Sequence, residues 1–398
     1  MRRRSGAVLV LGLAAFVASW AFGSRALAPV GVGLILVGLS ARAWVRVAGS
    51  GVRLDRKAGK AQSVEGDDVR IAYRLHRAPT LPFGFAYVRE RVGRLGPHEL
   101  RLRRGRGELL LSSVPRGRYA FEEAEVVLED LLGLERVVIA AESGAPLVVH
   151  PRLVELDAIF SEAGRHGAAG RRLLLRRPSG FDLHSVREYE QGESLRKVHW
   201  PSTARRGRLM VKELEDSPRD DLVVLLDCAA SAVAGPPGAT SFDAQVRAAG
   251  SLLRAHVARG KRAALLVGPS AGRVVRVGSL DGEWPAVLDA LAAAEPDGER
   301  TLAHVLADER GPAGRAPELV VVTAQLDSRS ADRLAFGGAG RRVSVVWVDA
   351  ASFENRPHGL AEPGLLRLAS AGIPVAVVRY GDDLKRALEG AGARRRSA

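Results

Sequence analysis

The sequence predicts a mixed α/β protein made of a transmembrane helical hairpin, a small antiparallel β-sandwich and a doubly wound, Rossmann-like α/β domain. Three observations lead to this prediction. Two apolar runs lie within residues 1–48, short alternating patterns separated by Gly, Pro and Ser fill 61–155, and continuous apolar strands alternate with helical patterns over 222–392. A polar segment lies between them at 156–221, and a basic tail occupies 393–398.

The helical hairpin is predicted from length and charge. Residues 6–23 are uncharged and mostly apolar, and 26–41 form a second such run. A bilayer core needs roughly 20 apolar residues per helix, with a lower limit of about 17. The second run meets this if Arg42 extends to the headgroups and Trp44 lies at the interface. Only Ser24 and Arg25 separate the runs, so the two helices must form a tight hairpin.

Basic residues flank the hairpin and predict its sidedness. Residues 2–4 are all Arg, and the stretch 42–60 is strongly basic. The positive-inside rule then places both ends in the cytoplasm, which predicts a two-pass protein of the inner cell membrane with membrane lipids as partners. A signal peptide cleaved after Ala26-Leu27-Ala28 is the alternative, but a second apolar run directly after that site argues against it.

The charge and cysteine content narrow the functional classes. The net charge is +14, which suits an acidic partner protein, anionic lipid or nucleic acid. Aromatic residues do not alternate regularly with the basic ones, so no nucleic-acid binding is expected. A single cysteine, Cys228, excludes an intramolecular disulfide and a Cys-based zinc site.

The strand patterns differ between the two soluble parts. In the β-sandwich region 69–75 alternates (VRIAYRL), and further strands are expected at 87–92, 100–103, 108–111 and 118–127. In the α/β region the strands are continuous apolar runs, which is typical of a largely parallel sheet covered on both faces. These strands are expected at 222–227, 262–268, 273–277, 318–323, 342–348 and 373–379, with helices at 241–259, 283–293, 301–308, 328–334, 359–371 and 381–390. Ligands of such sheets bind at the carboxyl ends of the strands, which directs attention to Asp227.

Residues 180–215 read GFDLHSVREYEQGESLRKVHWPSTARRGRLMVKELE and are polar, aromatic and cationic at once. Tyr and Trp among paired charges predict a packed polar network, because buried charge must be matched and hydrogen-bonded. We therefore expect this segment to fold against the strand at 222–227 and to form a specific surface.

This segment resembles the signature of a large bacterial family, domain-of-unknown-function family 58. A second match covers 116–134 and 146–153, with Leu131-Leu132 where the family usually has Pro-Phe. The matching residues of the signature are Gly180, Phe181, Arg187, Tyr189, Gly192, Glu193, Arg196, Val198, Trp200, Ala204, Arg205, Leu209, Val211 and Lys212.

The resemblance implies both a fold and a partner. It implies that the α/β part is a von Willebrand factor type A-like domain. Genes of the family commonly neighbour one for a MoxR-type AAA+ ATPase, so the implied role is a non-enzymatic adaptor or scaffold for assembly or maturation of client proteins. The candidate partner-binding residues are Arg187, Tyr189, Arg196, Lys197, His199, Trp200, Arg205, Arg206 and Lys212.

Many von Willebrand A-like domains bind Mg²⁺ through a D-x-S-x-S motif with a distal Thr and Asp. Here Asp227 and Ser231 remain, but Ala229 replaces the first Ser and the distal stretch reads Thr323-Ala324-Gln325. Two oxygen ligands are too few for Mg²⁺. We therefore expect no metal or other cofactor and regard this as a degenerate site.

Two other functional classes stay open. His199, Ser202 and Asp227 could serve a hydrolase, but no G-x-S-x-G turn is present and no acid is recognisably placed to orient the histidine. We expect no catalytic residues and no enzymatic activity. The basic excess alone supports an anionic-lipid or nucleic-acid binder.

Overall fold

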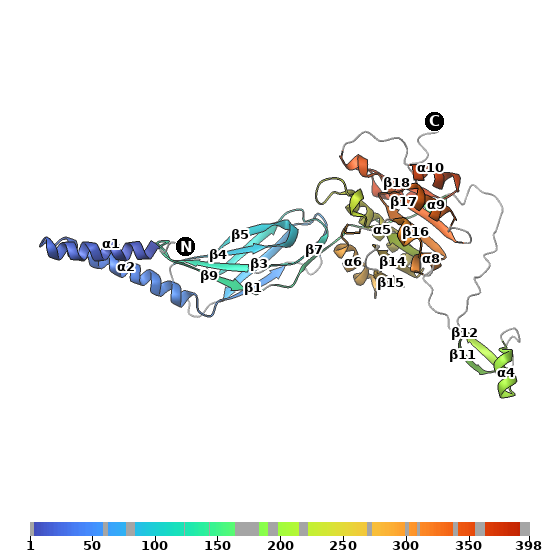
Figure 1. Cartoon of the computed structure of the whole chain (residues 1–398), viewed down its shortest axis with the longest axis horizontal. Helices are drawn as coiled ribbons and strands as arrows, with labels where there is room; N and C mark the ends of the chain where they lie inside the picture. Colours follow the sequence, from blue (N-terminus) through green and yellow to red (C-terminus); the bar gives the residue numbers. More distant parts are fainter. Residues whose placement is uncertain are drawn as a thin grey trace. The chain divides into compact units, whose positions relative to one another are not determined.

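The computed structural model describes residues 4–58, 63–76, 84–122, 124–142, 144–163, 183–189, 198–214, 222–268, 273–298, 302–308, 311–336, 341–354 and 363–390. They form a mixed α/β protein with two apolar N-terminal helices and several sheets (Figure 1). The chain divides into two compact units. Unit 1 holds Met1–Arg152 with Pro237–Ala239 and Leu288–Ala294, and unit 2 holds the remainder.

The N-terminal helices α1 (Arg4–Ala21) and α2 (Leu27–Ala48) are long and apolar enough to cross a membrane, as predicted. They pack closely through glycine. A Cβ added at Gly31 would lie 2.7 Å from the backbone nitrogen of Phe16, and one at Gly12 would lie 2.9 Å from that of Ile35. Small residues at such crossings allow backbones to approach in the way that membrane helices often do.

The β-rich part of unit 1 contains two antiparallel sheets and a third small sheet around one core. Alternation explains the pairing, since Val69, Ile71 and Tyr73 of one strand are buried while their neighbours face outward. The sheets are β1-β3-β6, β5-β4-β8-β9 and β2-β10-β7. Their strands are β1 (Arg53–Ala58), β2 (Ser63–Val64), β3 (Val69–His76), β4 (Phe85–Arg91), β5 (Pro97–Leu102), β6 (Arg106–Leu111), β7 (Gly117–Tyr119), β8 (Ala124–Glu129), β9 (Arg136–Ala141) and β10 (Leu147–His150).

One strand prediction in this unit is wrong. The stretch 118–127 was expected to be a single strand, but the structure divides it between β7 and β8. The chain changes sheets here: β7 pairs with β10, whereas β8 pairs with β4 and β9. Alternation continues across the break, which is why the pattern alone did not reveal it.

The α/β part of unit 2 is built on a six-stranded sheet of order β15-β14-β13-β16-β17-β18. Neighbouring strands are parallel except β15, which runs antiparallel to β14 at the edge. The strand order reverses beside β13, and ligands of open α/β sheets bind at such a switch point. The strands are β13 (Leu222–Leu226), β14 (Ala263–Val267), β15 (Arg273–Val277), β16 (Glu318–Thr323), β17 (Arg342–Val348) and β18 (Val375–Val378).

The helices of this part follow the predicted alternation. The longest, α5, begins with a capping box in which Thr240 and Asp243 bond each other's backbone N–H groups. The predicted helix at 301–308 is shorter in the structure, and α8 was not predicted. The helices are α3 (Phe160–Ala163), α5 (Ser241–Ala258), α6 (Trp284–Ala293), α7 (Leu302–Val305), α8 (Pro312–Arg315), α9 (Ser328–Phe336), α10 (Pro363–Ser370) and α11 (Leu384–Glu389).

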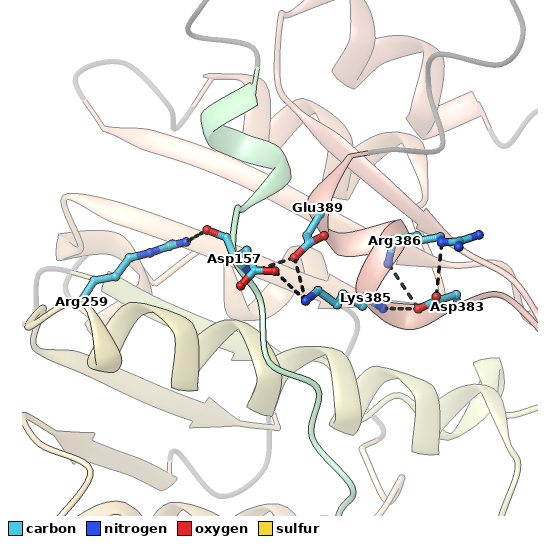
Figure 2. A network of polar contacts seen from close by, with 6 residues as sticks. All are labelled: Asp157, Arg259, Asp383, Lys385, Arg386 and Glu389. Atoms are coloured by element: carbon cyan, nitrogen blue, oxygen red, sulfur yellow. Dashed lines mark hydrogen bonds and ion pairs between the residues drawn. The ribbon is translucent and has the colours of Figure 1, made fainter.

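Asp157 ties the chain at the start of unit 2 to two helices (Figure 2). Its carboxylate accepts a hydrogen bond from Lys385 Nζ at 2.6 Å, and its N–H donates to Glu389 Oε1 at 2.8 Å. Its carbonyl oxygen accepts from the Arg259 guanidinium at 2.8 Å. Arg259 follows α5 and the other two residues lie on α11, so this residue connects both helices to the segment before α3.

Candidate functional site

The signature segment folds as a strand, a helix and a strand. β11 (Leu183–Glu188) pairs antiparallel with β12 (Met210–Leu214), and α4 (Trp200–Arg206) lies between them in sequence. This two-stranded sheet is separate from the six-stranded sheet. The segment does not add strands to the six-stranded sheet, because β11 and β12 pair with each other and β13 pairs with β14 and β16. That the segment folds against the strand at 222–227 stays a prediction.

Local hydrogen bonds fix α4 against β12. The N-cap His199 accepts from the Ser202 N–H through Nδ1 at 3.3 Å, and the Ser202 hydroxyl lies 2.7 Å from the same nitrogen. The His199 N–H donates to the Met210 carbonyl at 2.8 Å, and the Met210 N–H donates to Thr203 Oγ1 at 3.0 Å. Gly207 ends the helix in the left-handed conformation that favours glycine (φ 65°).

The structure brings several predicted partner-binding residues onto this small element. Trp200 is 65% exposed, Arg205 and Arg206 are exposed, and Tyr189 is half-buried. Arg187 lies opposite Val211, next to Lys212 on the paired strand. Arg196 and Lys197 lie outside the described residues.

The expected packed polar network is wrong for Trp200. Val198 and Met210, which flank α4 in the sequence, are buried, and Thr203 of α4 bonds the backbone of β12. The indole at the first helical position is left facing solvent. Tryptophan and arginine are both enriched at protein–protein hot spots, and α4 exposes one tryptophan and two arginines.

A second cluster lies at the carboxyl end of the six-stranded sheet. Asp227 follows β13 and is buried. Its Oδ2 accepts from the Thr323 hydroxyl at 2.7 Å, and its Oδ1 accepts from the Ala229 N–H at 3.2 Å. Ser231 donates to the Gln325 side-chain oxygen at 3.0 Å, and the Gln325 N–H donates to Thr323 at 3.0 Å. The adjacent strands β13 and β16 thus bring Asp227, Ser231, Thr323 and Gln325 together.

Burial dominates the electrostatics of Asp227. It raises the pKa of that carboxyl above its usual value, and the hydrogen bonds from Thr323 and Ala229 offset only part of the rise. Both oxygens of Asp227 have neutral donors. This carboxylate is therefore charged at a cost, without a cation to compensate it among its bonded partners.

The geometry of this cluster does not fit the Mg²⁺ that von Willebrand A-like domains often bind. Ala229 contributes an N–H rather than a hydroxyl, and Ser231 donates its hydrogen to Gln325. Within the described residues no group of three or more His, Cys, Asp or Glu side chains has the spacing of a metal site. The polar groups of the cluster form hydrogen bonds with one another, and we derive no metal chemistry from them.

The hydrolase residues do not form one hydrogen-bonded chain. The bonds of His199 and Ser202 are those of a helix cap, and the described bonds of the Asp227 side chain go to Thr323 and Ala229. The family resemblance identified Thr323 and Gln325 as the distal part of this site. It did not predict the bonds of Thr323 to Asp227 and of Ser231 to Gln325, which depend on the adjacency of β13 and β16.

Comparison with known proteins places the chain in a family. A family model described as "Protein of unknown function DUF58" matches residues 185–395, which is more than half of the chain. The chain therefore belongs to that family, as its signature predicted.

Individual matches add less. The "Uncharacterized protein YeaD" of Bacillus subtilis (strain 168) is 27% identical over 237 residues, which cover 59% of this chain and 57% of the relative. The chain thus spans less than two thirds of that relative. Among solved structures, Cwp6 from Clostridium difficile has a TM-score of 0.15 and 7% identity over 81% of this chain and 53% of its own, a likeness too low to support any argument.

Proposed function

We propose that this member of the DUF58 family is a membrane-anchored, non-enzymatic adaptor that a MoxR-type AAA+ ATPase engages during assembly or maturation of client proteins. In this proposal α1 and α2 hold the chain in the inner cell membrane. The basic residues that flank them support a cytoplasmic location for both soluble units. A cytosolic ATPase could then reach the signature segment.

The fold of unit 2 supports a von Willebrand A-like identity for its α/β part. Its sheet is parallel except for an antiparallel edge strand, and its order reverses beside β13. Asp227 lies at the strand end where such domains place their first metal ligand. The donors around Asp227 bond one another, which favours a protein-binding role without a metal.

The observation that carries the proposal is the exposure of Trp200. Trp200 is 65% exposed and lies on the same short helix as the exposed Arg205 and Arg206, so its large apolar surface is in contact with water in the isolated chain. Burial in a partner's pocket would recover that apolar area, and the guanidinium groups would pair with acidic residues around the pocket. The family resemblance supplies the identity of the partner.

The test is binding between the detergent-purified chain and a MoxR-type AAA+ ATPase from the same organism. We expect Trp200→Ala to weaken binding about 30-fold or more, because truncating a hot-spot residue costs about 2 kcal/mol or more. Arg205→Glu should weaken it further and slow association, through charge repulsion with an acidic surface.

Phe336 and Arg333 provide a matched control. They lie on α9, Phe336 is 83% exposed and Arg333 is exposed. The double variant Phe336→Ala, Arg333→Glu makes the same chemical changes away from α4 and should leave binding unchanged. It is compared with the α4 double variant Trp200→Ala, Arg205→Glu. Equal loss of binding in the two double variants would assign the effect to net charge and apolar area. Full binding by the α4 double variant would exclude α4 as the docking element.

A further inference from the structure

The loop between β8 and β9 is a tight turn held by one buried aspartate. Asp130 accepts from the Leu132 N–H at 3.0 Å and from the Glu135 N–H at 2.6 Å. Its own backbone closes the loop, since its N–H donates to the Glu135 carbonyl and its carbonyl accepts from Gly133. Gly133 has a φ of 65°, which glycine adopts without strain. The loop therefore has a defined shape.

This turn presents two leucines to the outside. Leu131 is 56% exposed and Leu132 is 62% exposed. They lie next to each other at the tip, and the hydrogen bonds of Asp130 hold them there. A soluble protein would normally place polar residues at such a tip, because turns face water.

The same loop is bonded to the ends of both apolar helices. The Ser5 N–H, in the first turn of α1, donates to the Leu134 carbonyl at 3.3 Å. The Ser5 hydroxyl donates to the Glu135 carboxylate, and Arg42 of α2 lies 3.5 Å from the same carboxylate. Arg42 also donates to the Ser5 hydroxyl at 3.0 Å. Ser5 is fully buried in this junction, which we call the Glu135 clasp (Ser5, Arg42, Glu135, Leu134).

The clasp fixes the depth of the loop relative to the helices. Ser5 and Arg42 lie where the apolar part of each helix meets the polar flank, so they lie at the headgroup level when the hairpin spans a bilayer. The interfacial layer is about 5–7 Å thick on each side. Leu132 lies two positions before Leu134, and an extended chain covers at most about 3.5 Å per residue, so the leucines lie within reach of that layer.

We propose that Leu131 and Leu132 form a membrane-contacting wedge that inserts into the headgroup and upper acyl region beside the helical hairpin. The occupant is lipid, because the clasp bonds the turn that carries the leucines to both membrane-crossing helices where their apolar parts end. The wedge fixes the orientation of the β-rich part of unit 1 on the bilayer. Without it, only the short segment between α2 and β1 would set that orientation. This inference rests on the membrane anchoring in the proposed function and is independent of the ATPase.

The experiment uses the full chain in vesicles of phosphatidylethanolamine and phosphatidylglycerol. Single variants Leu131→Cys and Leu132→Cys carry an environment-sensitive fluorophore, and nitroxide lipids labelled at shallow or deep acyl positions act as quenchers. Cys228 is 1% exposed, so it stays in place and the wild type is the labelling blank. We expect blue-shifted emission at both positions and stronger quenching by the shallow nitroxide than by the deep one.

Two labelled control positions separate the outcomes. Leu110 on β6 is 52% exposed but is not part of the clasp, and Leu11 is an exposed residue of α1. If labels at Leu131 and Leu132 behave like the Leu110→Cys label while the Leu11→Cys label is quenched, the wedge is wrong and the anchor stands. If the Leu11→Cys label also escapes quenching, both are wrong. Photo-leucine at 131 and 132 gives a second readout without a bulky label, and lipid crosslinks are the expected result.

Discussion

Glu90 in unit 1 and Asp227 in unit 2 are both buried carboxylates, and they differ in what surrounds them. Burial raises the pKa of each above its usual value. Glu90 has a cation, since one oxygen lies 2.8 Å from Arg56 Nε and the other accepts from the Tyr73 hydroxyl at 2.7 Å. Among the residues that the structure describes, the donors to the Asp227 carboxylate are the neutral groups of Thr323 and Ala229.

The difference separates a charge that the fold needs from one that it tolerates. The Arg56 side chain is as buried as its partner, so each of these two charges depends on the other. Asp227 leaves no buried cation behind when its charge is removed. Buried groups with shifted pKa values are enriched at functional sites, and ligands of open α/β sheets bind at strand ends such as the one that holds Asp227.

The largest expected effect tests the ion pair. Glu90→Gln keeps an acceptor for Tyr73 but leaves the Arg56 guanidinium buried without a carboxylate. We expect unit 1 to lose about 3–5 kcal/mol of its free energy of unfolding. The measurement is hydrogen exchange with mass spectrometry on the detergent-purified chain over a denaturant series, followed on peptides from β3 and β4.

A double variant sharpens this result. Arg56→Met combined with Glu90→Gln removes both charges, so it should recover most of the stability that Glu90→Gln loses. If the double variant is as unstable as the sum of the two single variants, the pair is not coupled and the contrast with Asp227 fails.

The second largest expected effect is at the carboxyl ends of the central strands β13 and β16. Thr323→Val keeps the shape of the side chain but removes the hydroxyl, so Asp227 Oδ2 loses a donor and the Gln325 N–H loses an acceptor. We expect unit 2 to lose about 1–3 kcal/mol, read from exchange in β13 and β16. Thr323→Ser retains the hydroxyl and should lose less than Thr323→Val. The reverse order would assign the role of Thr323 to its methyl group.

The fold was predicted where burial dictates the sequence. β13 and β16 are runs of apolar residues without a polar face, and only a strand covered on both sides needs that. β1 was not predicted, because its outward residues Arg53, Asp55 and Lys57 give it the composition of a linker. The order of the six strands depends on which distant segments pair, and alternation within one strand carries no information on that.

The candidate site was predicted in part for the same reason. Asp227 was identified as a strand end from local pattern alone. Its bond to Thr323 connects residues 96 positions apart and follows from the adjacency of β13 and β16. The exposure of Trp200 was not predicted, because the local pattern does not show that Val198 and Met210 are buried there while the tryptophan is not. Whether α4 binds an ATPase stays a prediction.

The third prediction is a gain in the free energy of unfolding, whereas the first is a loss. Asp227→Asn removes a charge that burial disfavours, and the new amide can donate to Thr323 Oγ1 while Thr323 donates to the Gln325 carbonyl, 2.8 Å away. The raised folded pKa means that the stability contribution of Asp227 is fully present below the unfolded pKa and is lost as pH rises through the folded pKa. We therefore expect the variant to exceed the wild type by on the order of 1 kcal/mol at pH 8 and to lose this advantage near pH 4.

The difference between variant and wild type is the quantity to measure, because acid acts on both. Burial lowers the pKa of His256 to about 3. Its contribution to stability is therefore fully present above its unfolded pKa and is lost as pH falls through the folded pKa. The stability lost through His256 is the same in the variant and the wild type, so it cancels in the difference between their free energies of unfolding. A variant that is less stable than the wild type at pH 8 would show that the fold does need the Asp227 charge.

The smallest expected effect is at Asp157, whose carboxylate is exposed and screened by solvent, unlike those of Glu90 and Asp227. Its hydrogen bond to Lys385 lowers the pKa of this exposed carboxyl, so its contribution is present above the unfolded pKa and is lost as pH falls through the folded pKa. Asp157→Asn leaves the backbone bonds to Glu389 and Arg259 in place and removes only the charge (Figure 2). We expect slightly faster exchange in residues 153–160 and α11 at pH 7 in low salt and no difference in 1 M salt, since exposed pairs are screened. A loss that persists in high salt would show that the carboxylate acts through geometry rather than charge, and Asp157 would then resemble Glu90 more than a surface residue.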